Sequence, residues 1–159
     1  MTEKHDDGTT RFVGKHKDGK RSGHGNLYHE NGNLKFSGNW RSGLIHSRGV
    51  RIWHNNKTLE FEGDVLDGKR ENHGKCYWSN GQLKFKGLHQ ANKIHDHNCK
   101  LYNENGFLVY EGAIKTGKKT GLGKLYNEHD GSLRFKGGFK NGEIHQQRAK
   151  IYSGKKPEE

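Results

Sequence analysis

The stretch Asn80-Gly81-Gln82-Leu83-Lys84-Phe85-Lys86-Gly87 joins a turn signal to a Leu-x-aromatic-x-Gly motif. An aromatic residue two positions before a glycine recurs six times at a regular spacing. The six glycines are Gly14, Gly38, Gly63, Gly87, Gly112 and Gly137, at steps of 24, 25, 24, 25 and 25 residues. A fixed period of this size predicts a repeat array, in which each unit packs only on its neighbours.

Each motif predicts one strand of a β-hairpin. The alternation of Leu and an aromatic residue is typical of a half-buried strand, and the Asn-Gly or Asp-Gly pairs that precede most motifs favour type I′ turns. Folding the chain back at these turns places a small or apolar residue opposite each aromatic residue. The predicted pairs are Leu27 with Phe36, Ile52 with Phe61, Cys76 with Phe85, Leu101 with Tyr110 and Leu125 with Phe135.

A second turn lies five residues after each repeat glycine, first at Asp18-Gly19. Folding there predicts that an aromatic ring covers a strand glycine; the predicted pairs are Phe12 with Gly25, Phe36 with Gly49, Phe61 with Gly74 and Tyr110 with Gly123. The expected fold is all-β: an elongated, twisted antiparallel meander of about six stacked β-hairpins. We expect a flexible N-terminal segment (1–10), a single repeat array (11–152) and a polar C-terminal tail (153–159).

The units also alternate in kind, with a superperiod of two repeats. From the turn glycine to the residue that closes the next hairpin, even units have one residue more than odd units, and this extra residue predicts a β-bulge. Even units carry Ile45, Ile94 and Ile144 after the turn, which we expect to form an apolar clasp on the core face. Odd units carry bases there, which predict a basic rim: Lys20, Arg21, Lys69, Arg70, Lys118 and Lys119.

The chain is strongly basic, with 29 Lys and Arg against 18 Asp and Glu and only 28% hydrophobic residues. This balance predicts an acidic partner, such as an acidic protein surface, a phospholipid headgroup or nucleic acid; the alternative is a merely solvated surface. No helix-turn-helix, zinc-finger or RNA-binding aromatic motif occurs, so we expect no sequence-specific nucleic-acid binding. The two cysteines do not form a disulfide framework, and the sequence lacks a long apolar run, so we expect a cytoplasmic protein.

A candidate binding face lies opposite the core. The predicted register alternates aromatic residues with bases there, and such pairs can stack on a ligand and neutralise its charge. The candidates are Tyr28, Lys35, Trp53, Tyr77, Lys84, Tyr102, Tyr126 and Arg134, with Tyr152 as a further aromatic of this face. In the alternative, these rings pack under the connecting loops, because apolar residues are scarce and the fold needs them.

The segment His95-Asp96-His97-Asn98-Cys99 is the one local metal candidate, since alternate residues of a strand point to the same side. The bulge predicted at this place disturbs that alternation, and we expect no metal and no cofactor. No Ser/His/Asp set, phosphate-binding loop or paired carboxylates stand out in the sequence. We therefore expect no catalytic residues and no enzyme activity.

Two segments carry a resemblance to a known family: Phe135-Lys136-Gly137-Gly138-Phe139-Lys140-Asn141-Gly142, and Tyr110-Glu111-Gly112 followed by Gly117, Gly121-Leu122-Gly123 and Tyr126. They resemble MORN repeats, in the variant with an Asn-Gly-x-Leu hairpin turn, and the resemblance covers about residues 11–152. It departs at Asn92, which replaces a turn glycine, and at Asn98 and Arg148, which replace the second glycine of a Gly-x-Gly pair.

The resemblance implies an elongated, twisted all-β rod or groove that serves as a scaffold or protein-interaction module, or else as a structural component of a larger assembly. Two alternatives remain open: binding to an anionic phospholipid membrane through a basic face, and a bacterial antitoxin-like role. An uncapped terminal strand also predicts self-association through an end of the array.

Overall fold

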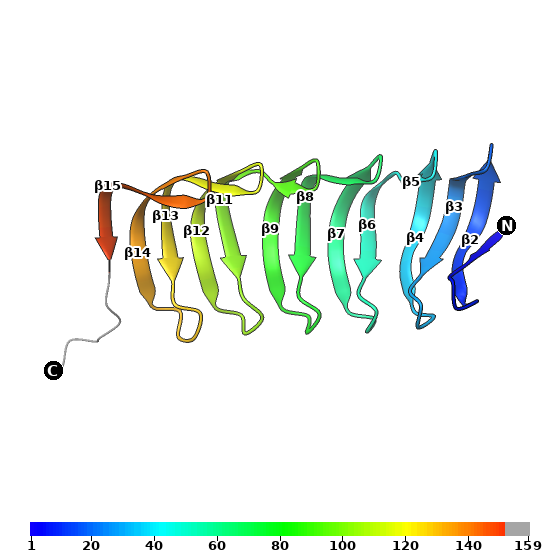
Figure 1. The fold of residues 1–159 in the computed structure, drawn as a ribbon, viewed down its shortest axis with the longest axis horizontal. Helices are drawn as coiled ribbons and strands as arrows, with labels where there is room; N and C mark the ends of the chain where they lie inside the picture. The colour runs from blue at the N-terminus through cyan, green and yellow to red at the C-terminus, as the bar shows by residue number, and fades with distance from the viewer. Residues whose placement is uncertain (152–159) are drawn as a thin grey trace.

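The computed structural model describes residues 1–151, with side chains described through residue 145. These residues form one antiparallel sheet of 15 strands and contain no helix, which confirms the predicted all-β meander (Figure 1). The strands are β1 (Thr2–Lys4), β2 (Thr10–Lys17), β3 (Lys20–Tyr28), β4 (Leu34–Arg41), β5 (Leu44–Ile45), β6 (Ser47–Trp53), β7 (Leu59–Leu66), β8 (Lys69–Tyr77), β9 (Leu83–Gln90), β10 (Lys93–Ile94), β11 (Asp96–Tyr102), β12 (Leu108–Lys115), β13 (Lys118–Tyr126), β14 (Leu133–Lys140) and β15 (Glu143–Ile151).

Neighbours in the sheet follow the chain order, except that the short strands β5 and β10 pair only with β4 and β9. The hairpin turns therefore lie along two opposite edges of the sheet (Figure 1). The predicted tail 153–159 and Tyr152 lie outside the described residues.

The turns with Asn-Gly signals, along the lower edge in Figure 1, reach the predicted register by an unexpected route. In the β3–β4 turn, the Gly32 N–H donates to the His29 carbonyl, and only Gly32 has a positive φ, of 82°. This pattern is a type I turn followed by a left-handed glycine; the predicted type I′ turn was wrong, since it needs two residues with positive φ. The pairing then skips Lys35, because Tyr28 pairs with Leu34 and Leu27 pairs with Phe36.

The different turn and the skipped residue offset each other, so the register beyond them is the predicted one. All five predicted pairs of an aromatic residue with a small or apolar residue are confirmed.

The turns along the upper edge are the type I′ turns of the molecule. Asp18 and Gly19 have φ values of 50° and 72°, and the other five upper turns likewise have two residues with positive φ. In β2 one residue separates Gly14 from His16, whereas in β3 three residues separate Arg21 from Gly25, so two extra residues form a bulge.

These bulges correct the predicted register by two residues. Phe12 pairs with Leu27, and Gly14 pairs with Gly25, because the bulge absorbs two residues at Gly23, whose φ is 64°. The same correction applies to Phe61 and Tyr110, which pair with Cys76 and Leu125. In an even unit, Phe36 pairs with Ile52. The shift of two in the odd units leaves the predicted faces of the paired side chains unchanged, whereas in the even unit the partner of Phe36 is shifted by three, from the predicted Gly49 to Ile52.

The predicted difference between odd and even units is confirmed, although odd units are also bulged. In the even hairpin from β4, three residues separate Phe36 from Trp40, while six separate Ile45 from Ile52. Even units thus have three extra residues where odd units have two. Ile45, Ile94 and Ile144 lie opposite the predicted partners Trp40, His89 and Phe139.

The first residues form a strand in place of the expected flexible segment. β1 pairs antiparallel with β2, with Glu3 opposite Phe12. The Glu3 carboxylate accepts hydrogen bonds from Arg21 and contacts His16, and these charge-assisted contacts hold β1 on the sheet.

The core is a row of nearly inaccessible rings on one face of the sheet, which we call the inner face. The rings are Phe12, Phe36, Phe61, Phe85, Tyr110 and Phe135, each at most 3% exposed. Edge-to-face contacts join them in pairs, because Trp40 contacts both Phe12 and Phe36 at centroid distances of 5.2 and 5.7 Å. His89 and Phe139 do the same in the next two pairs of units, so the superperiod is a property of the core.

Candidate functional site

The upper turns form a row of exposed bases along one edge of the sheet, which we call the basic edge. We define it as the six two-residue turns with one flanking residue on each side. Its bases are Lys17, Lys20, Arg41, Lys69, Lys93, Lys115, Lys118 and Lys140, and its acids are Asp18, Asp67 and Glu143. All eight bases are exposed, and the edge has a net charge of +5 from eight bases and three acids.

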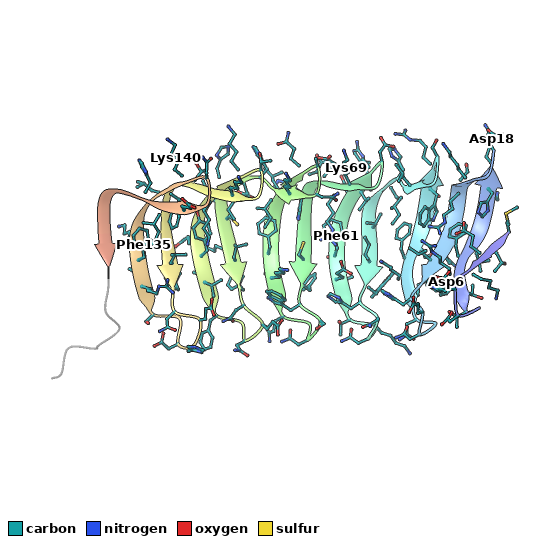
Figure 2. All side chains as sticks on the ribbon, in the orientation of Figure 1. Asp6, Asp18, Phe61, Lys69, Phe135 and Lys140 are labelled. Atoms are coloured by element: carbon teal, nitrogen blue, oxygen red, sulfur yellow. The ribbon has the colours of Figure 1, made fainter. Side chains whose placement is uncertain are left out.

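The lower turns carry the opposite charge, and we call them the acidic edge. They comprise residues 5–9, 29–33, 54–58, 78–82, 103–107 and 127–132. Their acids are Asp6, Asp7, Glu30, Glu104, Glu128 and Asp130, against the single base Lys57, which gives a net charge of −5. Figure 2 shows Asp6 on this edge, whereas Asp18, Lys69 and Lys140 lie on the opposite edge. The molecule is therefore electrostatically two-sided.

Hydrogen bonds between successive repeats fix the positions of neighbouring turns along both edges. On the basic edge, a turn amide donates to a carbonyl of the preceding repeat, as from Gly43 to Arg21 at 2.9 Å and from Gly68 to Ile45 at 2.8 Å. On the acidic edge, side chains donate to the next turn, as from His29 Nε2 to the Trp53 carbonyl at 2.8 Å and from Asn80 Nδ2 to the Glu104 carbonyl at 2.6 Å. These bonds explain how so polar a sequence is stabilised.

The structure divides the predicted basic rim between two places. Lys20, Lys69 and Lys118 lie on the basic edge and are exposed. Arg21, Arg70 and Lys119 turn instead onto the inner face, above the rings of Phe12, Phe61 and Tyr110. Glu3 pairs with Arg21, and Glu60 pairs with Arg70, so these two arginines are covers of the core and not free rim charges.

Prediction from sequence missed five members of the basic edge: Lys17, Arg41, Lys93, Lys115 and Lys140. Most of them stand directly before an upper turn, so the sequence did carry a signal, namely a base beside a two-residue turn. It also missed the acidic edge, whose signal was an acid within or beside an Asn-Gly turn.

The predicted aromatic and basic residues do not pair as expected. The rings are half-buried and lie opposite leucines in the register: Tyr28 with Leu34, Trp53 with Leu59, Tyr77 with Leu83, Tyr102 with Leu108 and Tyr126 with Leu133. Lys35, Lys84 and Arg134 are the residues that the pairing skips at each bulge.

Two of these bases lie on the inner face. Lys35 lines a groove with Ile45, Ile52 and Arg70, and the Lys84 ammonium lies 4.1 Å from the centre of the Trp78 ring.

The opposite, outer face carries a ladder of charges across neighbouring strands. Glu62 contacts Arg51 and Lys75, at 3.3 and 3.7 Å. Glu111 binds Lys124 at 3.0 Å and accepts a hydrogen bond from the Tyr126 hydroxyl. These hydrogen bonds, that from Lys124 first, lower the pKa of Glu111. The Tyr126 hydroxyl is thus engaged within the chain.

The metal candidate does not assemble. Cys99 is buried in the core, and Asp96 accepts hydrogen bonds from the Leu88 and Asn98 amides, which fixes the bulge at this place. Among the described side chains, no three His, Cys, Asp or Glu residues gather in a way that could hold a metal ion.

Both cysteines and the one fully buried histidine of the described core are kept uncharged. Burial raises the pKa of Cys99 to about 12 and raises that of Cys76, whose sulfur lies 3.5 Å from His89 Nε2. Burial also lowers the pKa of His89. A protonated thiol is a poor nucleophile, so these groups act as core residues.

Comparison with known proteins agrees with the repeat architecture. A family model described as MORN repeat matches residues 13–34, 36–58 and 61–83. The same hairpin geometry continues beyond these residues through β15. No curated protein matches the chain, and the described part contains no helix long and apolar enough to cross a membrane.

Proposed function

Because the chain is a MORN-repeat protein, and MORN repeats are generally linked to scaffolds that bind proteins or membranes, we propose that it is a non-catalytic interaction module. Its basic edge binds an acidic surface of a partner protein.

The opposite charges of the two edges, +5 and −5, are the observation that carries the proposal. Of the eight bases on the basic edge, only Arg41 has an ion pair within the described residues, to Asp67. Seven exposed lysines of this edge therefore have no ion pair among the described residues. Such a row attracts an acidic surface and repels a basic one.

The register supports a role in binding. Lys17 lies directly opposite Lys20, and Lys115 lies directly opposite Lys118. Like charges that face each other across strands destabilise a hairpin. An arrangement that costs stability at two equivalent turns is typical of residues that serve function.

The spacing suits an extended or flat acidic partner. Successive upper turns are two strands apart, roughly 10 Å at about 4.8 Å per strand. A partner that contacts several turns at once gains from each weak ion pair, which alone is worth about 0–1 kcal/mol on an exposed surface.

Charge reversal tests the proposal. The triple variant Lys20→Glu, Lys69→Glu and Lys118→Glu is compared with a matched variant of the acidic edge, Glu30→Lys, Glu104→Lys and Glu128→Lys. Fluorescence anisotropy with a labelled deca-glutamate peptide should show salt-dependent binding that the first variant loses and the second retains. Equal binding by the wild type and the basic-edge variant would refute the proposal.

The same edge also favours a second candidate function, binding to an anionic membrane, because its bases lie in one row. Sedimentation with vesicles of phosphatidylcholine, with and without phosphatidylserine, separates the two functions. We expect no sedimentation at physiological salt. Sedimentation that needs phosphatidylserine and is lost in the basic-edge variant would show that the basic edge binds a membrane and would contradict the protein partner.

The open edge of β15 supports a further part of the proposal, self-association at an end of the array. Within residues 1–151, the backbone of β15 pairs only with β14, and an unpaired strand edge is a template for another chain. Light scattering should detect dimers as concentration rises; a monomer at every concentration would contradict this part.

A further inference from the structure

In each odd unit a cation covers the buried ring of the same unit. The Arg21 guanidinium carbon lies 4.6 Å from the centre of the Phe12 ring, and that of Arg70 lies 4.5 Å from the centre of the Phe61 ring. The Lys119 ammonium lies 5.1 Å from the centre of the Tyr110 ring. The three positions are equivalent in the repeat and lie on the inner face.

The first two cations each have a carboxylate. Glu3 accepts a hydrogen bond from Arg21 Nε at 3.0 Å, and Glu60 accepts one from Arg70 Nη2 at 2.7 Å. In both cases a half-buried cation is neutralised beside an aromatic ring, where an ion pair is screened less than on an open surface.

The third cation has none within the described residues. Val109 stands ten residues before Lys119, as Glu60 stands ten residues before Arg70. Lys119 is half-buried all the same, so its charge is partly withdrawn from water without a compensating carboxylate.

A second cation belongs to the same place. Arg70 lies 3.8 Å from the Cys76 sulfur and donates to Glu60, and the charge of Lys84 also acts on this thiol. Two repeats further on, the same repeat positions hold Val109, Lys119 and Arg134, and Leu125 takes the position of Cys76. Arg134 is exposed and has no ion pair within the described part of the chain. This unit thus keeps both cations of the earlier one and lacks its carboxylate.

We propose that Lys119 and Arg134 form a binding site for an aspartate or glutamate side chain of the partner protein, which takes the place that Glu60 has beside Arg70. The inference rests on the proposed function and gives it a second, specific contact. The chain itself indicates a carboxylate, because a carboxylate binds each of the other two cations: Glu3, from β1, binds Arg21, and Glu60 binds Arg70.

A groove with a volume of 380 Å³ borders Val109, and its lining does not include Lys119 or Arg134. Glu104 and Glu128 also line it, from the acidic edge. Their charges oppose a bound carboxylate, so Glu128→Gln should strengthen binding.

The test is a titration of the full ¹⁵N-labelled chain with a deca-glutamate peptide. Backbone amide shifts are expected at Val109, Lys119 and Arg134, as well as along the basic edge. Val109→Glu supplies the missing carboxylate within the chain and should abolish the shifts at Lys119 and Arg134, with affinity there reduced about fivefold or more. Val109→Gln introduces a side chain of nearly the same size as glutamate but without its charge, and it should retain the shifts at Lys119 and Arg134.

The outcomes separate this inference from the proposed function. Shifts confined to the basic edge would overturn the carboxylate site and leave the proposed function intact. Shifts at Lys119 without any along the basic edge would support the carboxylate site and overturn the proposed function of the basic edge. Shifts at Lys119 that persist in Val109→Glu would also overturn the site, as would equal shifts with inorganic phosphate at the same charge concentration. No shifts anywhere would overturn both.

Discussion

The ring of Phe61 lies against the backbone of Gly74 on the neighbouring strand, so closely that a Cβ on Gly74 would stand 2.6 Å from Cε2 of the ring. Gly74 has no positive φ, so space alone requires glycine here. Gly74→Ala should lower the free energy of unfolding by about 1–3 kcal/mol, the usual cost of overpacking a core. Urea denaturation measures the loss.

A variant with leucine in place of Phe61 provides the control, because leucine is smaller than the ring that the methyl group of Gly74→Ala would meet. In a Phe61→Leu background, Gly74→Ala should cost clearly less, because the clashing ring atoms are gone. Equal losses in the two backgrounds would show that the ring does not set the requirement for glycine.

The contact between Phe61 and Gly74 also shows what sequence reasoning could reach. It predicted the ring over the glycine but paired the two residues directly, whereas Gly74 lies opposite Gly63. The two residues that separate prediction from structure lie in the bulge at Asn72, whose φ is 58°. Turn chemistry fixes a register only as far as the next bulge, and a bulge is set by side-chain packing on both faces.

The same limit explains which residues of the candidate site could be predicted from the sequence. Lys35 was assigned to the outer face by simple alternation from Phe36, and the bulge at the start of β4 changes its side. The basic edge, by contrast, could have been found in full, because residues beside a two-residue turn are exposed whatever the register beyond it. Site residues near a turn were thus predictable, and those beyond a bulge were not.

Thr116 holds a backbone conformation that suits it poorly. Its φ is 52°, the left-handed region, which costs an L residue about 1–2 kcal/mol, and asparagine tolerates it better. Asn141 occupies the equivalent place in the last turn. Thr116→Asn should therefore raise the free energy of unfolding by about 0.5–1 kcal/mol, as measured by thermal and urea unfolding. Thr120→Asn, at a strand position without positive φ, should give no gain; equal gains would contradict the explanation.

His54 connects two repeats on the acidic edge through Nε2, which donates to the Tyr77 carbonyl at 3.1 Å. In the next repeat the indole of Trp78 does the same for Tyr102, at 2.9 Å. His54→Trp should therefore retain the fold with little loss, whereas His54→Phe removes the donor and should cost about 1 kcal/mol. Hydrogen exchange of the Tyr77 strand and urea unfolding measure both variants. Equal stability of the two would show that the ring packs but does not donate.

Arg70 covers the Phe61 ring in an odd unit, where even units have isoleucine, such as Ile45, packed against the core. If packing of the Arg70 side chain on the ring contributes more than its ion pair with Glu60, Arg70→Ile combined with Glu60→Val should change the free energy of unfolding by less than about 1 kcal/mol. Arg70→Ala removes the aliphatic stem and should cost about 1–2 kcal/mol. Chemical unfolding decides between them. A larger loss in the double variant than in Arg70→Ala would show that the ion pair is the main contribution.

Glu3 makes the N-terminal strand sensitive to acid. Hydrogen bonds from Arg21 and then His16, opposed by burial, lower the pKa of its carboxyl from 4.5 to about 2. Because the pKa is lower in the folded chain, the stabilisation is complete above about pH 5 and is lost as the pH falls toward 2. Since nearly a third of the side chain is exposed, solvent screening reduces the gain to about 1 kcal/mol. In Glu3→Gln, the difference in unfolding free energy between pH 7 and pH 3 should shrink by up to this amount, whereas Glu30→Gln on the acidic edge should leave it unchanged. An unchanged difference in Glu3→Gln would mean that β1 stays on the sheet without this carboxylate.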